Sequence, residues 1–186
     1  LGMFQWVFLL TTNLASRLPE GSITAINVGW IVMQMPEVIF GMAIATAAFP
    51  AMSRLAAGGS TDALGETISG TLRAILALVL PSTVALLFFG RSYIALFFGL
   101  DARATAMVYR TTVAFTAGLI GHSLLELAAR IFYAHKNTLV PFAVALGATV
   151  LNLLLCVLLG PALGAPGLAL ANSIAVTLQS GLLLWL

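Results

Sequence analysis

Charged side chains are scarce in this chain, and their scarcity excludes an ordinary soluble domain. Only 8% of the 186 residues are Asp, Glu, Lys or Arg, whereas 61% are hydrophobic. Soluble domains carry about 25% charged residues. The mean hydropathy of +1.09 points the same way. The apolar runs allow about five or six helices of roughly 20 residues, the length that crosses a bilayer, so the composition indicates an integral membrane protein.

Cysteine, clustered histidine and catalytic motifs are also lacking. Cys156 is the single cysteine, which excludes a disulfide framework, and we expect it to be a small buried hydrophobe. His122 and His135 are not spaced with carboxylates as zinc ligands are. Neither a GxxxxGKS/T loop nor a GxSxG elbow is present. We therefore expect no metal, no cofactor and no enzymatic activity, and a lipid-modifying enzyme would need catalytic residues from outside this chain.

The basic residues are few and dispersed, so we expect neither nucleic acid as a partner nor a polybasic lipid anchor. If the helices alternate in direction, the basic side chains divide equally between the two sides of the membrane. One side receives Arg17, Arg91, Arg103 and Arg110, and the other receives Arg54, Arg73, Arg130 and Lys136. The positive-inside rule therefore leaves the orientation open.

The remaining pattern is a series of apolar segments, which predicts an all-α bundle. We expect helices of roughly membrane-spanning length at about 1–15, 25–52, 67–90, 105–133, 139–159 and 167–186. The chain begins without a methionine and stops inside an apolar run, so we expect residues 1–186 to be a single transmembrane lobe of a longer polytopic protein.

The breaks between these segments are predicted from their Pro, Gly and polar residues. We expect a hydrophilic turn at residues 53–66 and a linker at residues 160–166, GPALGAP. The apolar piece 93–100 is too short to span a bilayer and is expected to lie at the membrane interface. Pro36 should kink the helix predicted over 25–52 or free one of its backbone carbonyls.

A polar stripe interrupts the helix predicted over 105–133. His122, Glu126 and Arg130 are four residues apart in succession, which places them on one face of that helix. An ionisable side chain at membrane depth costs roughly 2.5–3.5 kcal/mol on insertion scales, so such a stripe is expected to face a bundle interior or a watery cavity. This arrangement is typical of a transporter or a channel.

Two interpretations of the stripe stay open. In the structural one, Glu126 and Arg130 neutralise each other while His122 hydrogen-bonds to another helix. In the functional one, the stripe contacts a substrate or an ion. Glu37 has the same ambiguity, because a carboxylate beside the break at Pro36 is also how transporters build ion sites near the membrane midplane.

The helix predicted over 25–52 also has a polar face. A helical projection groups small and polar residues on one side, as a packed or cavity-lining surface requires. These residues are Asn27, Trp30, Gln34, Glu37, Gly41, Ala45 and Ala48. We therefore take Asn27, Gln34 and Glu37, together with His122, Glu126 and Arg130, as candidates for a substrate or ion cavity.

Two stretches carry a family resemblance, PEVIFGMAIATAAFPAMSRLAAGG at residues 36–59 and ARIFYAHKNTLVP at residues 129–141. They resemble the MurJ/MviN family of lipid II flippases, within the multidrug/oligosaccharidyl-lipid/polysaccharide exporter superfamily, and the intervening segments agree in colinear order. The resemblance implies a two-lobed, multi-pass helical transporter in the bacterial cytoplasmic membrane, of which this chain is most of the C-terminal lobe.

The resemblance also implies a substrate, partners and an orientation. The substrate would be undecaprenyl-pyrophosphate-linked disaccharide-pentapeptide, the peptidoglycan precursor, carried to the outer leaflet by alternating access. The partners would be membrane lipid and an N-terminal lobe. Family topology would place Arg54, Arg73, Arg130 and Lys136 toward the cytoplasm, and Arg17, Arg91 and Arg103 outside.

One position departs from the family pattern. Members commonly carry a cavity arginine a few residues before the proline of the second helix, where this chain has Trp30 and Ile31. The phosphate would then be held from the other lobe, or the chain would handle a different lipid-linked sugar. A related exporter of another lipid-linked oligosaccharide, an ion-coupled drug antiporter, and a non-transporting scaffold or lipid enzyme are therefore alternatives.

Overall fold

A computed structural model describes residues 11–186, and these residues form an all-α bundle as the sequence predicts. Residues 11–15 are helical, while the rest of the helix predicted over 1–15 lies outside the described residues. The elements that follow are α2 (Ser22–Pro36), η1 (Glu37–Met42), α3 (Ala43–Ala57), α4 (Thr61–Phe98), α5 (Ala102–Thr116), α6 (Leu119–Ala134), α7 (Leu139–Leu163) and α8 (Ala165–Trp185).

The described helices provide four or five candidate membrane spans. Four are long and apolar enough by themselves, namely the continuous rod 22–57 and helices α4, α7 and α8. The pair α5 and α6 passes the same test as one span with a bend of 43°. Large apolar side chains such as Phe88, Leu96 and Leu139 are exposed on the outer faces, as a lipid environment requires. These features fit a multi-pass membrane protein.

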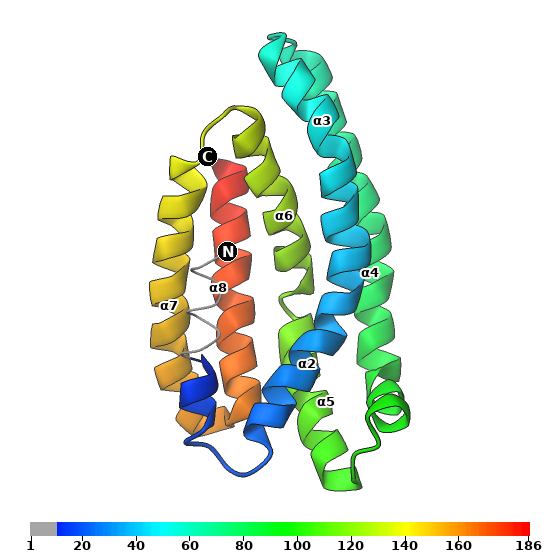
Figure 1. The fold of residues 1–186 in the computed structure, drawn as a ribbon, viewed down its shortest axis with the longest axis vertical. Helices are drawn as coiled ribbons and strands as arrows, with labels where there is room; N and C mark the ends of the chain where they lie inside the picture. Colours follow the sequence, from blue (N-terminus) through cyan, green and yellow to red (C-terminus); the bar gives the residue numbers. More distant parts are fainter. Residues whose placement is uncertain (1–10) are drawn as a thin grey trace.

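Helix α8 lies at the centre of one half of the bundle, where it packs against α7, α6 and α5 (Figure 1). Helices α3 and α4 form a long hairpin along the other side of the molecule (Figure 1). The turns that follow α3 and α6 lie at one end of the bundle, and those that precede α2 and follow α4 and α7 lie at the opposite end. Basic residues at the ends therefore separate into the two groups that alternating helices predict.

Two predicted connections are wrong because the helices run further than expected. The turn predicted over 53–66 shrinks to residues 58–60, since α3 continues to Ala57 and α4 begins at Thr61. The linker predicted over 160–166 shrinks to Gly164, whose φ of +68° suits glycine, while the prolines around it lie inside α7 and in the first turn of α8.

The separate interfacial segment predicted over 93–100 is also wrong. Residues 67–98 belong to one uninterrupted helix, α4, which is 38 residues long. No helix breaker lies between Gly90 and Gly99, and the helix ends only where Gly99 adopts a φ of +58°. Pro81 is accommodated inside this helix.

The disturbance expected at Pro36 is present as the π-helical segment η1. Proline has no N–H to donate to the carbonyl four residues earlier, so one α-helical hydrogen bond is missing at this point. Short π segments of this kind are frequent at functional sites. A side-chain carbon at Gly41 of η1 would lie only 2.8 Å from Cβ of Ser123 on α6, so the missing side chain allows the two helices to pack closely.

The single helix predicted over 105–133 is wrong as well, because the chain bends between α5 and α6 at residues 117–118. The N–H of Gly118 donates to the carbonyl of Phe115 at 2.9 Å, which leaves the carbonyl of Ala114 without its usual helical partner. The hydroxyl of Ser173 on α8 donates to that carbonyl at 2.7 Å. The bend is therefore stabilised by a side chain distant in sequence.

Replacement of Gly118 should test this packing. A Cβ at Gly118 would lie 2.7 Å from the backbone Cα of Ser173, so one backbone must move. We expect Gly118→Ala to destabilise the protein by about 1–3 kcal/mol, the usual cost of overpacking. Thermal unfolding of the purified protein in detergent measures this change.

Gly70→Ala is the matched control, because nothing lies within 4 Å of a Cβ at that helical position. Alanine should be neutral there or slightly stabilising. Equal unfolding temperatures for the two variants would contradict the close contact between the bend and α8.

Candidate functional site

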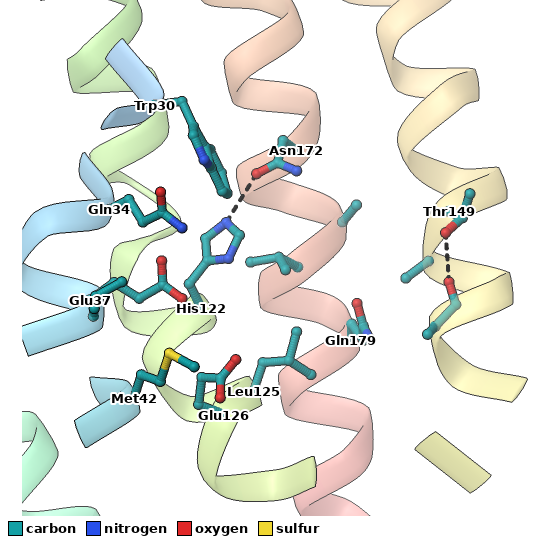
Figure 2. A pocket seen from close by; sticks show the side chains of 15 residues that line it. Trp30, Gln34, Glu37, Met42, His122, Leu125, Glu126, Thr149, Asn172 and Gln179 are labelled. Atoms are coloured by element: carbon teal, nitrogen blue, oxygen red, sulfur yellow. Dashed lines mark hydrogen bonds between the residues drawn. The ribbon is translucent and has the colours of Figure 1, made fainter. Parts of the chain in front are cut away.

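A cavity of about 470 Å³ with polar and apolar side chains in its wall lies among α2, η1, α6, α7 and α8. Figure 2 shows the side chains that line it, on the ribbons of these elements. The lining residues are Trp30, Gln34, Glu37, Val38, Met42, His122, Leu125, Glu126, Ala145, Ala148, Thr149, Asn172, Ala175, Val176 and Gln179. The cavity therefore combines amide, carboxylate and imidazole groups inside an otherwise apolar bundle.

Glu37 is the first residue of η1 and is only 8% exposed. Its Oε2 atom is buried and has no hydrogen-bond partner in the structure. In Figure 2, Glu37 and Gln34 project from their helix toward His122. A buried carboxylate without a partner carries a large desolvation cost, and natural proteins seldom retain one without a functional reason.

His122 holds α6 against α8. Its side chain is 4% exposed, and Nε2 lies 3.0 Å from Oδ1 of Asn172 (Figure 2). Because an amide oxygen only accepts, Nε2 is the nitrogen that carries the hydrogen in this contact. The imidazole also meets the Trp30 ring edge to face, with ring centroids 5.2 Å apart. Both contacts give His122 a structural role in the cavity wall.

Glu126 and Arg130 form an ion pair one turn apart on α6. Arg130 also donates to the carbonyl of Glu126 at 2.9 Å and to Oγ1 of Thr46 on α3 at 2.7 Å. Glu126 lines the cavity, whereas Arg130 is not one of its lining residues. The guanidinium is therefore directed toward α3, where it offsets the charge of Glu126.

The structure brings together four of the six candidate residues from the sequence. Gln34, Glu37, His122 and Glu126 line the cavity, whereas Asn27 and Arg130 do not. Asn27 lies half-buried on α2, nearly two turns before Gln34.

Sequence reasoning did not select the residues that α7 and α8 contribute. Asn172 and Gln179 on α8 and Thr149 on α7 complete the polar wall. The seven-residue spacing of Asn172 and Gln179 places both on one face of a helix, and this spacing is the signal that could have found them. Thr149 carried no such signal in the sequence. In the structure its hydroxyl bonds to the carbonyl of Ala145 within α7.

The charge of the cavity decides what it can bind. Its lining residues include two carboxylates and no Lys or Arg. Carboxylate and amide oxygens accept hydrogen bonds from ammonium, hydroxyl and amide groups, whereas an anion such as phosphate is repelled. The walls are therefore suited to a neutral polar group or a cation.

Comparison with known proteins finds a matching protein family along the full length of the chain. The family model described as Lipid II flippase MurJ matches residues 1–186. The Lipid II flippase MurJ of Burkholderia cenocepacia is 30% identical over 182 residues, which are 96% of this chain and 35% of that protein. The Probable lipid II flippase MurJ of Thermotoga maritima is 32% identical over 174 residues, 92% of this chain and 36% of that protein. The chain thus spans about a third of the length of these relatives.

Solved structures show the same fold. The inward closed conformation of a lipid II flippase MurJ superposes with a TM-score of 0.88 at 24% identity, over 98% of this chain and 39% of that one. The crystal structure of a mutant MATE protein superposes with a TM-score of 0.87 at 15% identity, over 99% of this chain and 41% of that one. The fold of this chain is therefore shared with both proteins.

The contact between His122 and Asn172 yields a test of how the cavity wall is held. Asn172→Ala leaves a buried imidazole N–H without its partner, which should cost about 1–3 kcal/mol of stability. Thermal unfolding in detergent measures the loss, and Gln179→Ala on the same helix and cavity wall is the control. If both variants unfold at the same temperature, the imidazole contact does not hold α6 to α8.

Proposed function

Because the chain belongs to the Lipid II flippase MurJ family along all of its residues, we propose that it is one lobe of a flippase in the bacterial cytoplasmic membrane. The transported molecule is undecaprenyl-pyrophosphate-linked disaccharide-pentapeptide, a precursor of peptidoglycan. The observation that supports this proposal in the structure is a cavity between apolar helices, with carboxylate, amide and imidazole groups in its wall.

The physical chemistry of this substrate requires such a cavity. Sugars, peptide and pyrophosphate cannot enter hydrocarbon without losing hydrogen bonds to water, at a cost of several kcal/mol for each group. A flippase must therefore offer polar surface to the head group while the prenyl tail stays in lipid. The amides of Gln34, Asn172 and Gln179 can replace water around sugar hydroxyls and peptide groups.

The pyrophosphate must be bound elsewhere, because the lining residues of the cavity include no Lys or Arg. We assign that role to the other lobe, which lies outside this chain. The lobes would then hold different parts of one head group, with the anionic end on the far side of the central passage. No bond is made or broken, so the activity is transport without enzymatic chemistry.

The bends in the helices are positioned for a change of conformation. The π segment after Pro36 and the break at residues 117–118 lie on adjacent elements, since η1 packs against α6. Helix segments above and below these points can tilt relative to each other without breaking regular helix. We propose that the helices bend at both points during alternating access. In this orientation Arg54, Arg73 and Lys136 lie on the cytoplasmic side.

A second candidate function has its own supporting observation. The two carboxylates in the cavity wall, and a fold that also matches a MATE protein, favour export of a cationic drug coupled to an ion. Efflux of cationic dyes that is lost in Glu37→Gln would support this candidate over the first.

Complementation tests the main proposal directly. In bacteria depleted of their own lipid II flippase, the full-length protein that contains this chain should restore growth and cell shape. Membrane expression is confirmed by immunoblot, and an empty vector is the control. Lysis at the same rate as the empty vector, despite normal membrane levels, would refute the proposal.

The pair of Glu126 and Arg130 gives a second test in the same assay. Removing either charge alone leaves a partly buried, unpaired partner, whereas Glu126→Gln with Arg130→Gln removes both. We expect the double variant to retain transport within about threefold of the unaltered protein, and each single variant to lose more. A double variant as inactive as the worse single one would instead place Glu126 in contact with substrate.

A further inference from the structure

The carboxylate of Glu37 is a buried acceptor that no group of the described structure satisfies. Its side chain is 8% exposed, and Oε2 is both buried and without a hydrogen-bond donor. The same side chain lines the cavity and is directed into it (Figure 2). The carboxylate that lacks a donor is therefore part of the cavity wall, beside the space where a bound group would lie.

Glu37 differs from the other carboxylate of the cavity in this respect. Glu126 has its counter-ion in Arg130, which reaches it from the next turn of α6. Arg130 is itself occupied by Glu126 and Thr46. The guanidinium of Arg130 is thus already paired, and the lining residues provide no Lys or Arg for Glu37.

We propose that the cavity binds a protonated amino group and that Glu37 is its counter-ion. The inference rests on the proposed function, and within it the amino group belongs to the peptide of the transported lipid. A peptide offers such a group wherever it contains a diamino acid. This lobe then recognises the cationic end of the head group, and Glu37 determines specificity for it.

The size and chemistry of the site suit an organic ammonium. An ammonium group has three N–H donors, and the wall of the cavity of about 470 Å³ offers as acceptors the carboxylate of Glu37 and the amide oxygens of Gln34 and Gln179. The indole of Trp30 is part of the same wall, and aromatic faces attract ammonium groups. Among the described residues, no three His, Cys, Asp or Glu side chains come close enough together to hold a metal ion.

The test compares two substrates rather than relying on a variant alone. The full-length protein is reconstituted in proteoliposomes, and transport is measured for a lipid-linked pentapeptide with a free side-chain amine and for the same lipid with that amine acetylated. We expect the unaltered protein to move the free amine about tenfold faster, the factor that 1.4 kcal/mol of interaction produces. The acetylated lipid keeps its pyrophosphate and sugars and loses the positive charge of the amine.

Glu37→Gln identifies the residue that discriminates. This variant keeps the size of the side chain and removes its charge, so the two lipids should be transported at similar rates. Glu66→Gln is the matched control, because Glu66 is exposed on α4 and is not one of the cavity-lining residues. It should keep the tenfold preference. Thermal unfolding in detergent verifies that both variants are folded.

The remaining outcomes separate this inference from the proposed function. Equal transport of the two lipids by the unaltered protein would overturn the inference while leaving a lipid II flippase in place. Transport of neither lipid would overturn the proposed function and the inference with it. Sodium can also be replaced by a large organic cation. If this replacement abolishes transport of both lipids equally, and Glu37→Gln removes the sodium requirement, the cation bound by Glu37 is an alkali ion. That result would refute binding of the amino group.

Discussion

The close packing of α6 against η1 on one side and α8 on the other is the constraint on which the cavity depends. Three glycines make it possible, because a Cβ at Gly41, Gly118 or Gly121 would lie less than 3 Å from Ser123, Ser173 or Thr177 respectively. Small residues allow this approach in membranes, where no hydrophobic force drives helices together. With the three elements fixed in this way, His122 reaches α8 and Glu37 faces the same space.

The membrane environment explains why nearly every other polar side chain here is satisfied within the protein. Buried threonine and serine hydroxyls bond to carbonyls one turn earlier, as Thr112 and Ser123 do, and Ser173 supplies the carbonyl exposed by the bend. Such bonding is required where no water is available. Two atoms depart from this pattern, since Oε2 of Glu37 and Nδ2 of Asn152 are buried without a hydrogen-bond partner. Of these two residues only Glu37 lines the cavity, the place where a substrate would bind.

The sequence predicted the helical class, the spacing of His122, Glu126 and Arg130, and the disturbance at Pro36, because each follows from local periodicity or from proline chemistry. The bend at residues 117–118 could not be predicted, since Gly118 is tolerated inside helices and the group that stabilises the bend, Ser173, is distant in the chain. Asn172 could be selected from its seven-residue spacing with Gln179, but its contact with His122 could not. Its role appears only when α8 lies beside α6, and that contact depends on glycines whose neighbours the sequence does not reveal.

Thiol accessibility can reveal whether a hydrated, substrate-binding cavity exists between these helices. In full-length protein with Cys156→Ala, Gln34→Cys in the cavity wall should react with a membrane-impermeant maleimide in vesicles, and added lipid II should slow that reaction. Ile39→Cys, 60% exposed on the apolar outer face of η1, should stay unreactive because a thiol in lipid does not ionise. An unreactive thiol at position 34, or labelling that lipid II leaves unchanged, would contradict the account.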